Sequence, residues 1–467
     1  MYYHRYSKEE IEYTKKYSHI LKKSPSYFIN SPKADLYEYS FDEVRAISFV
    51  LARYYKNNPV NHENQVIFFE FTFRDVKGAD INTRNKRLSV GDYIFNKLSK
   101  RKETHNESVL FHKEKGEYCS VSCVEKYKNK LKKREEFLSK RMLVVNENLS
   151  ISMNEMIETQ QQSKLSEVYL TNTMLEQMAS NEGRSWMMIT LTAPGKYHIN
   201  PVKGKNRWNK DCSPIECDSF LTRAYRAAYK ALKKDVERSK IEEIYGAWSK
   251  EPHKSGAIHM HVLFYVLPNE VERYKELFTN ALRNSFKREG ERFYKNTSIN
   301  FKTQNKDFIE YDKDGNVTKK AGSGASYLFK YIMKSLNVME FKPQEGKRIK
   351  IEDGDKIAAH NSMYNYKRFS FVGVNSCFTK WRLTRQIFKD FEKNPDGEIL
   401  PDTTKIIFDI VKNNDIAAFS QLEDVIKIDY KETLNYYGET IKTPIGIFIE
   451  KEYYLKPKKT IITKIPE

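Results

Sequence analysis

Two long apolar segments constrain the fold of this chain more than any other feature. Residues 186–194 read WMMITLTAP, and residues 257–266 read AIHMHVLFYV. Both are typical of buried strands, and Pro194 ends the first because proline cannot donate to a strand ladder. A further strand is predicted over 244–250, and the residues EPHKSG that follow supply the proline and glycine of a tight turn. An antiparallel hairpin is therefore expected inside the core.

Helices are predicted around these strands. Apolar residues recur at helical spacing over 218–238, 269–286 and 326–336, and a short strand is predicted over 298–301. The order strand, helix, hairpin, helix, strand, helix predicts an α+β fold with a central antiparallel sheet and flanking helices.

The length of 467 residues favours more than one domain. We predict an N-terminal region over 1–165 of unknown role, for which DNA binding is one candidate. A sheet-containing domain is expected over 166–342, and an accessory or DNA-binding region over 343–467. The outer regions are expected to be mostly helical, apart from a strand over 65–74, and the polar residues 146–162 are interpreted as a linker.

The chain is strongly basic, with a formal net charge of +19 at pH 7. Such a protein is attracted to polyanions because each neutralised phosphate releases counterions. A cationic surface that only favours solubility is the alternative. A basic helix is predicted over 124–141, where a solvated surface is commoner than a specific DNA contact, and another helix is predicted over 405–428.

Several classes of protein are disfavoured by what the sequence lacks. The five cysteines form no regular framework, and Cys119 and Cys123 have C-x3-C spacing that suits reduced structural thiols better than zinc. The N-terminus has no apolar signal segment, and no run of about 18 apolar residues occurs. No G-x4-G-K-[ST] motif is present. We therefore expect a cytoplasmic protein with no membrane partner and no nucleotide cofactor.

Two histidines flank one methionine in the strand 257–266. Residues i and i+2 of a strand point to one side, so His259 and His261 should share a face while Met260 packs in the core. Glu251 lies across the predicted turn, where antiparallel pairing can bring its carboxylate beside both rings. Two nitrogens and one oxygen predict a site for Mg²⁺ or Mn²⁺ acting on phosphate. Ordinary strand histidines and a surface salt bridge of Glu251 are the alternatives.

Three neighbouring residues are candidate DNA contacts. His253 lies in the predicted turn and is interpreted either as a substrate contact or as a turn residue. Thr190 and Thr192 alternate onto one face of the strand 186–194.

Two tyrosines are candidate nucleophiles. Tyr327 and Tyr331 are four residues apart on a predicted helix, so their hydroxyls share a face. Lys330 and Lys334 follow them by three residues, and an ammonium beside a phenol can lower its pKa. Core packing is the alternative, since other Y-x3-Y pairs occur at 2/6, 13/17 and 225/229.

These motifs together resemble a known family. EPHKSGAIHMH resembles the E-P-H-x-x-G-x-x-H-x-H motif of the phage gene A replication initiators, which are rolling-circle endonucleases of the HUH class. SYLFKYIMKS is similar to their Y-x-x-K-Y-x-x-K helix, and MMITLTAP to their first motif. NNDIAAFSQL and YGETIKTPIGI resemble C-terminal signatures, so the resemblance covers roughly residues 165–450. Met260 departs from the family, where this position is often aromatic.

The resemblance implies a Rep-like HUH endonuclease fold and a division of labour among the candidates. His259 and His261 become metal ligands with Glu251 as the third, and the two tyrosines become nucleophiles with Lys330 and Lys334 as electrostatic partners. The implied activity nicks the origin, leaves a 5′-phosphotyrosyl link and a 3′-OH primer, and later rejoins the displaced strand.

The implied partners are single-stranded or melted origin DNA and a host helicase and polymerase, in the cytoplasm of a bacterial host near its nucleoid. Two alternatives stay open. One is a two-tyrosine HUH transposase, and the other is a non-catalytic basic nucleic-acid-binding protein. The histidines precede the tyrosines, which disfavours a conjugative relaxase.

Overall fold

The structure is a computed structural model of the 467-residue chain. It describes residues 15–16, 38–57, 90–146, 149–304, 310–311, 317–319, 323–336, 340–341, 349–350, 353–373, 377–393, 401–413, 415–422, 425–434, 440–450 and 453–455. The chain divides into two compact units, Met1–Lys113 with Lys431–Thr443, and Glu114–Tyr430 with Pro444–Glu467. The predicted strand over 65–74 lies outside the described residues.

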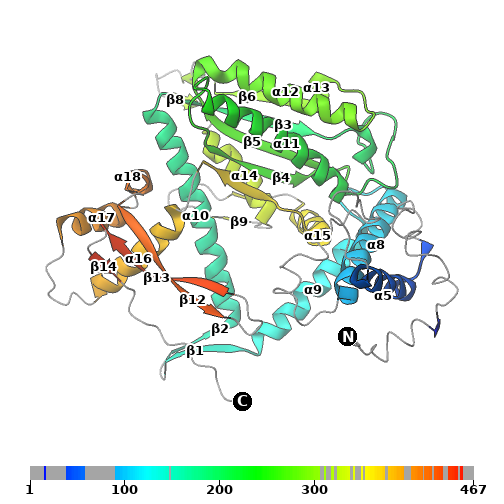
Figure 1. The fold of residues 1–467 in the computed structure, drawn as a ribbon, viewed down its shortest axis with the longest axis horizontal. Coiled ribbons are helices and arrows are strands. Elements are labelled where there is room, and N and C mark those ends of the chain that lie inside the picture. Colours follow the sequence, from blue (N-terminus) through cyan, green and yellow to red (C-terminus); the bar gives the residue numbers. More distant parts are fainter. Residues whose placement is uncertain are drawn as a thin grey trace. The chain divides into compact units, whose positions relative to one another are not determined.

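A five-stranded sheet forms the centre of the second unit (Figure 1). Its strand order is β11-β4-β5-β3-β6, and every neighbouring pair is antiparallel. The strands are β3 (Ser185–Thr192), β4 (Gly246–Pro252), β5 (Ile258–Val266), β6 (Ile299–Thr303) and β11 (Phe369–Val372). The prediction of an α+β fold with a central antiparallel sheet is confirmed, and four of the strands lie within two residues of their predicted bounds. Strand β11 was not predicted.

Helices cover both faces of this sheet, because alternate residues of each strand are apolar toward opposite sides. Met187 and Met260 pack in the core cluster that includes the buried side chains of α11 (Pro214–Glu237) and α12 (Val271–Arg288). Met188 packs in the second cluster, with α10 and α14. Those two helices span Met153–Asn181 and Gly324–Leu336. The expected inward packing of Met260 is confirmed.

The polar segment 146–162 is not a linker, so that interpretation is wrong. It contains β2 (Leu149–Ser152), which pairs with β1 (Met142–Asn146), and the first turns of α10. Ser152 caps the helix by accepting a hydrogen bond from the backbone of Glu155 at 3.1 Å. Glutamate, glutamine and methionine are good helix formers, so low hydrophobicity here marks an exposed helix surface.

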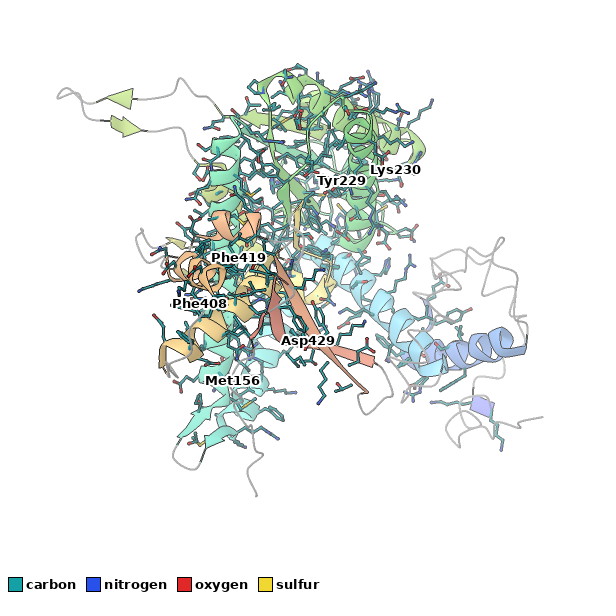
Figure 2. All side chains as sticks on the ribbon, turned by 60° about the vertical axis from the view of Figure 1, so that its left-hand side comes forward. Met156, Tyr229, Lys230, Phe408, Phe419 and Asp429 are labelled. Carbon is teal, nitrogen blue, oxygen red and sulfur yellow. The ribbon has the colours of Figure 1, made fainter. Side chains whose placement is uncertain are left out.

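The C-terminal region combines helices with a sheet, whereas a mostly helical region was expected. Aromatic side chains join its helices, and Phe408 and Phe419 (Figure 2) belong to the second core cluster. The predicted helix over 405–428 is two helices and the start of a strand. The elements are α15 (Gly354–Tyr364), α16 (Cys377–Lys393), α17 (Asp402–Lys412), α18 (Ile416–Gln421), and the sheet β12 (Ile426–Leu434), β13 (Thr440–Ile449) and β14 (Tyr453–Leu455).

Helices α5 (Phe41–Asn57) and α8 (Val90–Glu114) form the described helical part of the first unit. The N-terminus of α5 is closed by reciprocal hydrogen bonds between Ser40 and Glu43. The predicted basic helix is α9 (Val121–Ser139), in the second unit. The remaining short elements are η1 (Gly195–Tyr197), η2 (Pro268–Glu270), α13 (Lys295–Ser298), β7 (Glu310–Tyr311), β8 (Val317–Lys319), β9 (Glu340–Phe341) and β10 (Ile349–Lys350). No helix in the described ranges combines the length and apolar character that crossing a membrane requires.

Candidate active site

The two histidines of β5 lie where three strands are in register. His259 pairs with Glu251 of β4 and with Thr192 of β3. His261 pairs with Ser249 of β4 and with Thr190 of β3. Directly opposite residues of antiparallel strands share a face. The sheet therefore gathers imidazole, carboxylate and hydroxyl groups on the face that α14 covers.

His261 is held at both ring nitrogens. Its Nε2 lies 3.0 Å from Oε1 of Glu251, and its Nδ1 lies 3.0 Å from Oγ1 of Thr190. The imidazole is buried, with 4% of the residue exposed. These contacts fix the ring orientation, as second partners commonly do for histidines that bind metals.

His259 has a buried ring nitrogen to which no described residue hydrogen-bonds. This atom is Nε2. Burial, followed by the nearby imidazoles of His253 and His261, lowers the pKa of His259 to about 3. The ring is therefore neutral at physiological pH, and in the tautomer that carries its hydrogen on Nδ1 the buried Nε2 presents a lone pair. A buried nitrogen normally needs a partner, and a metal ion is one that this lone pair can bind.

The imidazole nitrogens of His259 and His261 and the carboxylate of Glu251 are of the right chemical type to bind a divalent cation, but they are not arranged around one position. Within the described part of the chain, no three His, Cys, Asp or Glu side chains are grouped closely enough to hold a metal ion. Glu251 instead contacts Nε2 of His261. Ion binding would replace this contact, because the same nitrogen and oxygen are the expected ligands.

Two residues that were not predicted from the sequence, His198 and Ser255, lie beside this histidine pair. Ser255 lies with its Oγ 2.8 Å from Nδ1 of His253 and 2.8 Å from Nδ1 of His198. The ring of His253 stacks on His259, with centroids 4.6 Å apart and planes at 16°. His198 also approaches the carbonyl oxygen of Ala193 with its Nε2, at 3.2 Å. The hydroxyl of Ser255 thus connects two imidazoles beside His259.

A signal for His198 is present in the sequence. His198 lies four residues after Pro194, and Pro194 ends the strand that carries the two threonines. Histidines are rare in this chain, which has only 10. Burial lowers the pKa of His198 to about 4 and also lowers the pKa of His253. The turn residue His253 is therefore part of a network rather than an isolated surface residue.

Helix α14 brings one candidate tyrosine directly onto the histidines. The ring of Tyr331 stacks on the ring of His261, with centroids 3.9 Å apart and planes at 18°. Lys330 is exposed on the same helix. Tyr327 and Lys334 belong to α14, but their side chains lie outside the described residues. The same helix packs in the second core cluster through Leu328, Phe329, Ile332 and Met333.

The two cysteines with C-x3-C spacing pack in the core. Cys119 and Cys123 form no disulfide, and both are buried in the first core cluster. The thiol of Cys119 contacts the carbonyl oxygen of Lys356 at 3.6 Å. Their packing agrees with the predicted structural role.

Comparison with known families bears on this geometry. The family described as bacteriophage replication gene A protein (GPA) matches residues 51–339, more than half of the chain. The chain belongs to this family. The matched range contains the entire histidine hairpin, both threonines of β3 and helix α14.

Individual relatives of this gene A family member are distant in sequence. The probable replication protein P12 of Pseudoalteromonas phage PM2 is 24% identical over 78% of this chain and 56% of that protein. The replication protein of Haemophilus phage HP1 is 26% identical over 63% of this chain and 36% of that protein. A probable replication endonuclease from a prophage-like region of Shigella boydii is 22% identical over 62% of this chain and 35% of that protein. The chain thus spans about a third to just over half of these relatives. No solved structure matches.

Proposed function

We propose that this gene A family member initiates DNA replication by nicking one strand through tyrosine attack and later rejoining that strand. The observation that carries the proposal is the stack of Tyr331 on His261, with ring centroids 3.9 Å apart. It brings a phenol against the buried ring of His261, and half-buried His259 and the carboxylate of Glu251 lie beside that ring on the sheet. An HUH endonuclease needs these groups together.

The chemistry follows from the groups present. The hydroxyl oxygen of Tyr331 would form a bond to a DNA phosphorus, while the bond from phosphorus to the 3′ oxygen breaks. The phenol proton is transferred to the leaving oxygen, which gives a 5′-phosphotyrosyl link and a free 3′-OH. One phosphodiester is exchanged for another, so no nucleotide hydrolysis is needed. The 3′-OH can then prime a polymerase.

A divalent cation would act from the histidine side of this stack. His259, His261 and Glu251 are the residues that would hold Mg²⁺ or Mn²⁺, and the orphaned Nε2 of His259 supports this assignment. When bound, the ion would supply Lewis-acid stabilisation of a phosphate oxygen. Thr190 orients His261 through its 3.0 Å contact.

The second tyrosine gives the reaction its return step. Tyr327 precedes Tyr331 by one turn of α14, so the two residues occupy neighbouring positions on one helix face. One tyrosine would retain the 5′ end while the other attacks the regenerated origin. The 3′-OH released by that second cut would then attack the first link and close the displaced strand. Lys330 and Lys334 would supply positive charge beside the phosphates.

The partners follow from the same chemistry. A tyrosine on a helix cannot readily enter an intact duplex, so single-stranded or melted origin DNA is the proposed substrate. The sequence has no Walker motif, so a host helicase would unwind the template and a host polymerase would extend the primer.

Detection of the covalent adduct tests the proposal. We would incubate the full chain with supercoiled DNA carrying its own gene and flanks, with Mn²⁺ or with EDTA. Nuclease digestion and mass spectrometry would then locate nucleotide on tyrosine. We expect a metal-dependent adduct on Tyr331 or Tyr327, reduced in either single Phe variant and absent from the double variant.

A matched control exists on α11. Tyr225 and Tyr229 form another Y-x3-Y pair whose ring centroids stack 5.8 Å apart, and they belong to the opposite side of the sheet. Tyr229 is labelled in Figure 2. Their double Phe variant should keep the adduct. An adduct that survives in the α14 double variant, or none on any DNA tested, would return the histidines to a structural role.

A further inference from the structure

Helix α9 carries a basic stripe that the active site does not use. The stripe consists of Lys126, Lys130, Lys133 and Arg134, all exposed. Spacings of three and four residues place them along one side of the helix. No described carboxylate forms an ion pair with the three lysines of the stripe, since the one pair on this helix joins Lys128 to Asp355 at 3.1 Å.

The other sides of α9 are occupied differently. Its apolar side packs through buried Cys123 and partly buried Val124 and Tyr127 on the first core cluster. Lys128 and Lys132 lie between these two sides, within three or four residues of Glu125, Glu135 or Glu136. Their charge is balanced locally, whereas Lys126, Lys130 and Arg134 are i, i+4 neighbours of like charge, which destabilises an isolated helix. An unbalanced row of cations on a packed helix indicates an anionic partner.

The start of α9 lies beside the active-site turn. The backbone N–H of Tyr118 donates to the carbonyl of Lys254 at 2.9 Å, and the Lys254 ammonium pairs with Glu117 at 3.0 Å. Lys254 lies between His253 and Ser255 in sequence, both of which belong to the histidine network. Ser120 caps the helix two residues after Tyr118. The first residue of the stripe, Lys126, therefore lies within two helical turns of the end of α9 that lies beside the β4–β5 loop, which carries His253 and Ser255.

We propose that the α9 stripe binds the phosphate backbone of duplex DNA flanking the nick. This rests on the proposed function and names a contact surface for it. Lys126 to Lys133 spans about 10 Å of helix, or about three base pairs of B-DNA. Lysine is a point charge on a flexible stem, which suits phosphate contact without base readout. Exposed Phe137 follows Lys133 and Arg134 by one turn, but the guanidinium of Arg141 lies over its ring, 3.4 Å from the centroid. One face of that ring is therefore occupied, which disfavours the base stacking that single-strand binding uses.

A paired comparison of variants tests the proposal. Lys126→Gln with Lys130→Gln removes two charges from the stripe, and Lys128→Gln with Lys132→Gln removes two charges from the locally balanced side of the same helix. The affinity of the full chain for a short blunt duplex is measured by fluorescence anisotropy over a range of salt concentrations. A second titration uses a single strand of equal length.

We expect the stripe variant to lose about 1.8 from the slope of log affinity against log salt, at about 0.9 per phosphate contact. At about 0.1 M salt this is up to roughly 60-fold in duplex affinity. The control variant should stay within about twofold, and both should form the adduct normally on a short single-stranded substrate. Equal losses in the two variants would overturn the proposal, because net charge alone would explain binding. Loss confined to the single strand would also overturn it. Absence of the adduct in every protein, with the duplex difference intact, would refute the nicking function and leave the stripe assignment standing.

Discussion

Substitution of Gly324 by alanine tests whether close packing of α14 on the sheet positions the nucleophile. A Cβ atom at this residue would lie 2.6 Å from Cγ, 2.7 Å from Cβ and 2.9 Å from Cδ1 of Trp186. Ordinary carbon contacts are about 3.5–4.0 Å, so the two groups must separate by roughly 1 Å. Rotation of the indole cannot relieve the contact with its Cβ, which is fixed to the backbone of β3. The helix must therefore move.

The magnitude follows in two parts. Overpacking of this kind destabilises by about 1–3 kcal/mol, offset by up to about 1 kcal/mol from the better helix propensity of alanine. Displacement of a reacting group by about 1 Å can cost about 100-fold in rate. Because Tyr331 follows on the same helix, we expect the rate of adduct formation under single turnover to fall about 100-fold while the free energy of unfolding falls by only about 1–2 kcal/mol.

Single-turnover adduct formation and urea denaturation measure the two effects, with affinity for a single-stranded substrate as a check on folding. Gly195→Ala is the matched control, since its Cβ would lie 3.7 Å from Arg207, an ordinary contact. Adduct formation at the wild-type rate in the Gly324 variant would refute the reasoning. So would an equal loss in the Gly195 variant.

Three further predictions concern the surroundings of the site. Thr190→Val removes the hydroxyl that contacts Nδ1 of the proposed ligand His261, and we expect Mn²⁺ affinity measured by calorimetry to fall about 10- to 100-fold; an unchanged affinity would exclude a positioning role. Burial lowers the pKa of His360 from its usual 6.5 to about 4. At this residue the unfolded chain therefore binds a proton that the folded chain excludes, so the contribution of His360 to stability should decrease by up to about 3 kcal/mol as the pH falls from about 6.5 toward 4. Urea denaturation should show a smaller pH slope for His360→Gln, and an identical slope would contradict the assignment. The buried ammonium of Lys250 pairs with Asp218. Lys250→Met should lower the free energy of unfolding by about 3–5 kcal/mol, and adding Asp218→Leu should recover most of it, which a double-mutant cycle in urea would measure.

The hairpin of the site could be predicted because its geometry follows from residues that are close together in the sequence. Alternation along a strand places His259 and His261 on one face, and the turn between β4 and β5 fixes the register that pairs Glu251 with His259. Pro194 and the helical spacing of apolar residues then placed the neighbouring elements to within a few residues. These signals need no knowledge of distant parts of the chain.

Other elements were missed because their stability comes from elsewhere in the fold. Helix α10 begins in a polar segment, and its buried side chains Leu165 and Leu175 pack in the second core cluster. Strand β11 is short and is defined by its pairing with β4, from Phe369↔Ser249 to Val372↔Gly246. Neither pattern is visible without the partner surface.

The stack of Tyr331 on His261 also depends on contacts between distant parts of the chain, so the spacing of the tyrosines alone does not predict it. Tyr225 and Tyr229 have the same four-residue spacing on α11, and their rings stack on each other with centroids 5.8 Å apart. What distinguishes Tyr331 is the surface on which its helix packs, and the absence of a side chain at Gly324 permits that approach. A glycine that only removes a clash leaves no periodic or chemical signal in one sequence. The tyrosine motif should therefore be functional only together with this glycine, which is why the Gly324 variant tests the site more sharply than the spacing of its tyrosines does.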